Sequence, residues 1–139
     1  MAIMDRTALF SDGQAVTATA ASTNVVDLGS HDVDYARDTG LGTSIPLELS
    51  VTESFNNLTS LTISIEIDDN AAFSSPTTIW TSPAYTQAQL ATGAKYLLPD
   101  HLPAGISERY IRLKYTVAGT APTTGKITAG VSAGRQSAQ

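Results

Sequence analysis

Hydrophobic and polar residues alternate without a break over residues 60–68, where four aliphatic side chains are separated by polar ones. Because successive side chains of a strand point to opposite faces, this period of two predicts a strand with one buried and one solvated face. The same pattern returns over residues 45–51 and 110–117. In the two longer runs the side chains expected to face a core are Leu61, Ile63, Ile65, Ile67, Ile111, Leu113, Tyr115 and Val117.

Shorter β-branched stretches and turn residues fill the rest of the chain, and residues 87–91 favour one helical turn at most. A first strand over residues 7–10 is expected to end in a turn at residues 11–13, and a long loop spans residues 30–44. The other predicted strands cover residues 14–20, 23–28, 77–82, 95–98 and 126–131. About eight strands without repeats predict an all-β jelly roll or antiparallel β-sandwich. We expect one domain over residues 1–139, with loose termini at about 1–6 and 132–139.

The composition predicts a thin core and limits the class of partner. Thr, Ser and Ala occupy much of the chain, so burial against a partner would add stability. A net charge of −5 and an isoelectric point of 4.7 argue against nucleic-acid binding, which needs clustered Lys and Arg. There is no cysteine, no signal-peptide core and no window of membrane-span length. We therefore expect a product of the cytoplasm with neither a nucleic-acid nor a membrane partner.

No motif for catalysis or metal binding survives inspection. His31, Asp32 and Asp34 lie close together in the sequence, and residues 68–70 (Asp-Asp-Asn) form an oxygen-rich corner, but neither group has the spacing of a known calcium loop. Glu66 and Asp68 share one strand face, where ordinary solvated side chains explain them better than a glycosidase pair does. The sequence therefore predicts no enzyme, no cofactor and no metal site.

Two exposed features remain as candidates for contact with another protein. Alternation places Tyr110, Arg112 and Lys114 on one outward face, which is a basic stripe in an acidic chain. The stripe is either a solvated face or a contact for an acidic partner surface. Alternation also places Trp80 on the face opposite Ile79, where a loop covers it or an interface uses it.

Several blocks of the sequence carry more information than alternation does. They are VDLG at 26–29, RDTGLG at 37–42, PLEL at 46–49, IEIDDNAAFSSPTT at 65–78, ERYIRLKYTV at 108–117 and TGKI at 124–127. Together these blocks resemble the jelly-roll capsid cement proteins of tailed bacteriophages, over residues 7–131. The most specific blocks are the central and closing ones, because they specify residues that alternation leaves free. One departure is residues 31–36, which look like extra length before the turn that follows them.

The resemblance implies a structural protein of the virion, made in the host bacterial cytoplasm and bound to the outer face of the capsid. It would tie neighbouring major capsid subunits together, and it would carry no catalytic residues and no cofactor. Contacts with other copies of itself are also expected, with a dimer favoured over a trimer. The alternative function is a carbohydrate-binding jelly roll on the virion. The candidate residues for capsid contact or self-contact are Arg37, Asp38, Trp80, Tyr110, Arg112 and Lys114.

Overall fold

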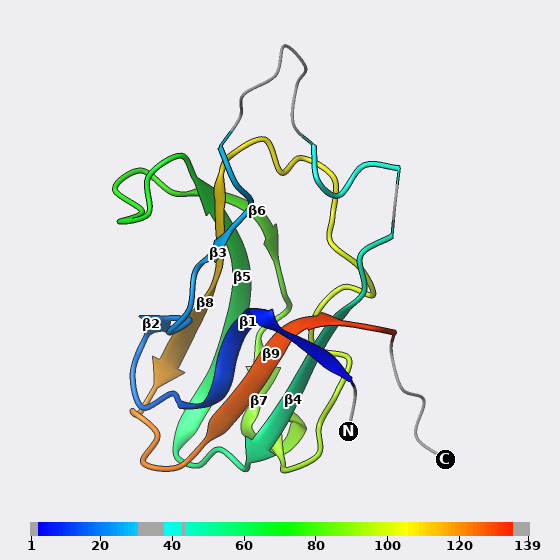
Figure 1. The fold of residues 1–139 in the computed structure, drawn as a ribbon. Helices are drawn as coiled ribbons and strands as arrows, with labels where there is room; N and C mark the ends of the chain where they lie inside the picture. The colour runs from blue at the N-terminus through cyan, green and yellow to red at the C-terminus, as the bar shows by residue number, and fades with distance from the viewer. Residues whose placement is uncertain (1–2, 31–37, 43, 135–139) are drawn as a thin grey trace.

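The structure, a computed structural model, describes residues 3–30, 38–42 and 44–134. Within these residues nine strands form two antiparallel sheets (Figure 1). The prediction of an all-β antiparallel sandwich is confirmed, and the one helical segment is the short 3-10 turn η1 (Gln87–Leu90).

The smaller sheet has three strands in the order β1-β9-β4. Their bounds are β1 (Met4–Ala15), β9 (Lys126–Ser132) and β4 (Leu47–Glu53). The central strand β9 pairs with β1 on one side and with β4 on the other, so the first and last strands of the chain lie side by side.

The larger sheet has six strands and is built around one long antiparallel pair, β5 (Leu58–Asp68) and β8 (Tyr110–Gly119). Its main order is β2-β8-β5-β6, with β3 also paired to β8 and β7 also paired to β5. The bounds of the shorter strands are β2 (Ala20–Ala21), β3 (Val26–Asp27), β6 (Thr77–Thr81) and β7 (Tyr85–Thr86).

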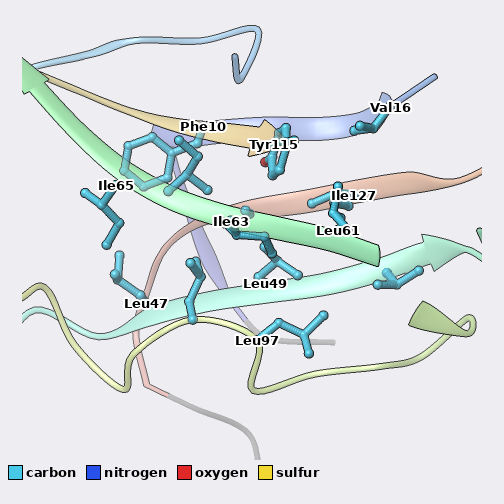
Figure 2. Packing of buried hydrophobic residues seen from close by; sticks show 14 of the residues in the cluster. Phe10, Val16, Leu47, Leu49, Leu61, Ile63, Ile65, Leu97, Tyr115 and Ile127 are labelled. Carbon is cyan, nitrogen blue, oxygen red and sulfur yellow. The ribbon is translucent and has the colours of Figure 1, made fainter. Parts of the chain in front are cut away.

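The core lies between the two sheets, and the side chains predicted to face inward do so. Of those eight residues all are buried except Val117, which is half-buried at the margin of the cluster. Figure 2 shows Leu61 and Ile63 of β5 in the same buried cluster as Leu49 of β4 and Ile127 of β9. The hydroxyl of buried Tyr115 lies 2.7 Å from Ser11 Oγ, so the polar end of that ring has a partner.

The connection between η1 and β8 runs along the free edge of β4 and adds buried Leu97, Leu98, Leu102 and Ile106 to the core. The backbone N–H of Leu47 donates to Asp100 O at 3.1 Å. The prediction of a strand over residues 95–98 is wrong, because Tyr96 has a φ of 62° and interrupts the extended backbone. Alternation could not show that this irregular segment supplies core leucines.

The first strand also differs from the prediction. β1 begins at Met4, within the terminus expected to be loose, and continues through residues 11–13, where a turn was predicted. Register shifts accommodate this stretch, and Gly13 takes a φ of 56° while its N–H donates to Thr128 Oγ1. At the other end, Ser132 belongs to β9 and pairs with Met4.

Alanine substitutions in β5 should have different effects on stability at its buried face and at its outer face. Ile63→Ala removes a fully buried side chain, and we expect a loss of about 2–5 kcal/mol in the free energy of unfolding. Thr62→Ala, on the opposite face of the same strand, should cost less than about 1 kcal/mol. Urea denaturation with an unchanged m-value measures both. Equal losses would contradict the assignment of faces.

Candidate functional site

The outer face of the larger sheet carries the polar side chains of β8. Tyr110, Arg112 and Lys114 are half-buried there and alternate with fully buried neighbours. The register of the β5–β8 pair sets Arg112 opposite Glu66 and Lys114 opposite Ser64. Side chains of directly opposite residues share a face, so Glu66 meets the stripe at its centre.

Glu66 forms ion pairs with both cations of this stripe. Its Oε2 accepts from Arg112, with distances of 2.8 Å to Nε and 2.7 Å to Nη2. Its Oε1 lies 3.7 Å from Nζ of Lys114. The side chain of Glu66 is only 5% exposed, although the sequence predicted a solvated residue. The stripe is therefore a mixed-charge network rather than a free basic surface.

Phe73, which sequence reasoning missed, forms the apolar support of this network. The guanidinium of Arg112 lies 4.1 Å from the centroid of the Phe73 ring, within the range of a cation–π contact. Phe73 is 6% exposed and has a φ of 49° in the connection between β5 and β6. A phenylalanine within an otherwise small and polar loop is the signal that could have indicated a buried role.

A second ion pair lies just before the start of β8. Arg109 forms two bonds of 2.8 Å to the carboxylate of Asp27, and its guanidinium lies 5.0 Å from the centroid of the Tyr110 ring. Both partners are well exposed, at 41% and 46% of their side chains, so solvent screens this pair. Tyr110 is therefore partly covered by a neighbouring arginine on its own face.

Trp80 does not lie on the outer face, and the prediction from alternation is wrong. The register pairs Ile65 with Trp80 and Glu66 with Thr78, which leaves Ile79 as an extra residue in a β-bulge. Trp80 therefore shares the side of the inward-facing Ile65. Both Ile79 and Trp80 pack against the core as half-buried side chains.

The structure separates the loop candidate from the stripe. Arg37 lies outside the described residues, as do His31, Asp32 and Asp34. Asp38 is half-buried, and its Oδ1 accepts from the backbone N–H of Gly105 at 2.9 Å. Asp38 thus helps to fix its loop against the connection before β8, and the structure does not bring it together with Arg112.

The acidic corner at the end of β5 is a hydrogen-bonded turn. Asp68 accepts from the backbone N–H of Asn70 at 2.9 Å and from that of Ser75 at 2.8 Å. These bonds, that from Asn70 foremost, hold the pKa of the Asp68 carboxyl below its ordinary value against the opposing effect of burial. Among the described residues no group of three or more His, Asp or Glu side chains could hold a metal ion. None of their helices is long and apolar enough to cross a membrane.

Comparison with known protein families identifies a family for this chain. Residues 10–131 match the Bbp16 family, from within β1 to within β9. The chain belongs to the Bbp16 family. The family name indicates a bacteriophage protein, which agrees with the phage origin expected from the sequence. A search of curated proteins finds no match for this Bbp16-family chain.

The buried charge network should stabilise the sandwich measurably. Glu66→Gln removes the charge that balances Arg112, and we expect the free energy of unfolding to fall by about 1.5–3 kcal/mol. A cycle with Arg112→Met should give a coupling energy of about 1–3 kcal/mol. The matched control is Asp27→Asn at the exposed pair, for which we expect about 0–1 kcal/mol. Independent, additive effects of Glu66 and Arg112 would contradict the pairing.

The turn at the end of β5 should respond to acid. Because the folded pKa of Asp68 lies below its ordinary value of 3.8, its stabilising contribution is present above that pH and is lost as the pH falls through the folded pKa. In an NMR titration, the amides of Asn70 and Ser75 should shift with a midpoint below 3.8. Asp68→Asn should abolish that transition at both amides. A midpoint above 3.8 would show that the two backbone bonds do not hold the charged form.

Proposed function

We propose that this chain is a capsid cement protein that binds the outer surface of a phage head and stabilises contacts between major capsid subunits. The observation that carries the proposal is the family match, which spans both sheets rather than one local motif. The blocks that resemble cement proteins include the β5–β6 connection and β8, which together build the network around Glu66. The proposed role needs no catalysis and no cofactor.

The proposed mechanism is mass action on the assembled shell. A protein that binds the closed shell but not separated subunits stabilises the shell by its binding free energy. Each copy then needs only a modest affinity, because many symmetric copies act on one head. The chain would be made in the bacterial cytoplasm and would end on the outer face of the virion.

The capsid-facing surface in this proposal is the outer face of the larger sheet. Lys114 is its most available cation, since its side chain is 42% exposed and lies at the long distance of 3.7 Å from Glu66. Arg112 is 19% exposed and already paired, so it shapes the surface more than it attracts a partner. Tyr110 lies on this face at the start of β8, whereas Trp80 packs against the core beneath the sheet and Asp38 bonds to Gly105 in the connection before β8.

Self-association is also proposed, with a dimer favoured over a trimer. The edge at Ile45 and Pro46 is covered within the chain, because Pro46 bridges to His101 and Leu102 N–H donates to Ile45 O. One edge of the larger sheet is β6, which within the described residues pairs only with β5. A β-branched edge strand with one side unpaired favours pairing with another chain.

The alternative of carbohydrate binding receives less support from the geometry. A sugar site usually places exposed aromatic side chains with a few convergent polar groups in a concavity. Trp80 packs toward the core, and Tyr110 lies against Arg109. A glycan-array screen of the purified protein is the corresponding test.

Addition of the purified protein to bare heads tests the proposal. We expect saturable binding and a higher temperature of head opening with the wild type. Lys114→Ala should weaken binding by about fivefold, the equivalent of about 1 kcal/mol. The matched control is Lys126→Ala, which removes a lysine of similar exposure on the smaller sheet that is 3.0 Å from Glu53.

Binding should also weaken as salt is raised, because screening acts over about 8–10 Å at ordinary ionic strength. Failure of the wild type to bind the heads would overturn the cement function. Equal binding by the wild type and Lys114→Ala would instead overturn the choice of surface.

A further inference from the structure

A hollow of about 300 Å³ lies on the outer face of the smaller sheet, away from the network around Glu66. Glu48 and Ser50 of β4 line it together with Thr128 of β9, Met4 of β1 and Lys95 of the connection beside β4. Figure 1 shows the first residues of β1 crossing over β9, and Met4 at this end of β1 lines the hollow. At about 30 Å³ for one water, the space could hold roughly ten waters or one long side chain.

Glu48 is the unusual residue of this hollow. It alternates with Leu47 and Leu49, which face the core, so its side chain lies on the outer face with that of Ser50. The residue is nevertheless 4% exposed, and among the described residues its Oε2 is buried without a hydrogen-bond partner. Lys95 lines the same hollow but forms no ion pair with Glu48 among the described residues.

A comparison of Glu48 with Glu66 shows which interaction the described residues do not give to Glu48. Both carboxylates occupy polar positions of an alternating strand, and both residues are 4% exposed. Glu66 accepts from Arg112 and lies near Lys114, whereas the described residues give Glu48 no such partner. A buried carboxylate oxygen without a partner is unfavourable, and the usual remedy is a paired cation that also donates hydrogen bonds. The larger sheet has a carboxylate with its paired cations, whereas the described residues give the carboxylate of the smaller sheet no paired cation.

We propose that this hollow is a binding site for the basic side chain of a partner protein, an arginine in the first place. A planar guanidinium can donate two bonds to one carboxylate, and its aliphatic stem suits the apolar side chain of Met4 at the wall of the hollow. Ser50 and Thr128 offer hydroxyl oxygens for the remaining N–H groups. A divalent cation fits less well, because the hollow has one carboxylate rather than several.

Lys95 acts in this proposal as the internal competitor for the same carboxylate. Its positive charge at the wall disfavours a second cation until that charge is displaced or removed. Removal of Lys95 should therefore strengthen binding of an external guanidinium, whereas removal of Glu48 should abolish it. If Lys95 and Glu48 were paired only to stabilise the fold, either substitution would instead lower the stability of the protein.

The test uses the isolated chain, so its outcome does not depend on the cement function. The probe is the peptide acetyl-Gly-Arg-Gly-amide, and its matched control carries citrulline, which keeps the shape but lacks the charge. In an NMR titration at low salt, we expect the arginine peptide to shift the amides around Glu48 and Thr128 with a Kd on the order of 1 mM. The citrulline peptide should cause no saturable shift.

Three variants complete the experiment. Glu48→Gln should weaken binding by at least about tenfold and leave the thermal midpoint equal or higher, because an unpartnered buried charge is removed. Lys95→Gln should tighten binding by about twofold to fivefold. Glu53→Gln, on the same strand but already paired with Lys126, should bind as the wild type does. Equal binding of both peptides, retention of binding by Glu48→Gln, or a marked loss of stability in that variant would each overturn the proposal.

Discussion

The register of β5 against β8 is the constraint on which the rest of the molecule depends. From Ser60 to Asp68 the two strands pair almost without interruption, with Ile63 opposite Tyr115 and Glu66 opposite Arg112. A slip of one residue would turn Arg112 toward the core and Leu113 toward solvent, because side chains alternate with a period of two. One alignment therefore fixes both the packing of the core and the ion pairs of the outer face. Fold and surface cannot be changed independently along this pair of strands.

The two sheets use buried carboxylates in different ways. On the larger sheet, Glu66 completes its charge balance within the chain, through Arg112 and Lys114. On the smaller sheet, Glu48 is equally buried, yet its Oε2 has no hydrogen-bond partner among the described residues. The first arrangement stabilises the isolated fold, because both charges of a desolvated pair are present. The second stores an unfavourable interaction that an incoming cation can relieve, so it favours association over isolation.

The sequence predicted the strands that alternate and failed where the backbone departs from alternation. β4, β5, β8 and β9 were located within a few residues because their inward positions are aliphatic. Trp80 was assigned to the wrong face because a bulge at Ile79 adds one residue, which no pattern of side chains reveals. Residues 95–98 resemble a strand in composition, but the positive φ of Tyr96 breaks it.

The charged residues show a second limit of prediction. The outward positions of Arg112 and Lys114 follow from alternation alone, whereas their partner Glu66 follows only from the register of two strands separated by more than forty residues. Burial of Glu48 cannot be predicted from alternation, which marks this position as solvated, because the hollow around it is lined by residues distant in the sequence, such as Met4 and Lys95.

Charge pairing within the chain also limits the electrostatic attraction available to a capsid contact on the larger sheet. A guanidinium 2.7 Å from a carboxylate presents a dipole rather than a free charge, and the field of a dipole decays faster with distance. Arg112 therefore adds little long-range attraction, and Lys114 provides most of what remains. Shape and short-range hydrogen bonds must then supply the larger part of the binding energy, as they do at the centre of most protein interfaces. A cement protein with such a face would hold the shell at ordinary salt, because close contacts are screened much less than distant charges are.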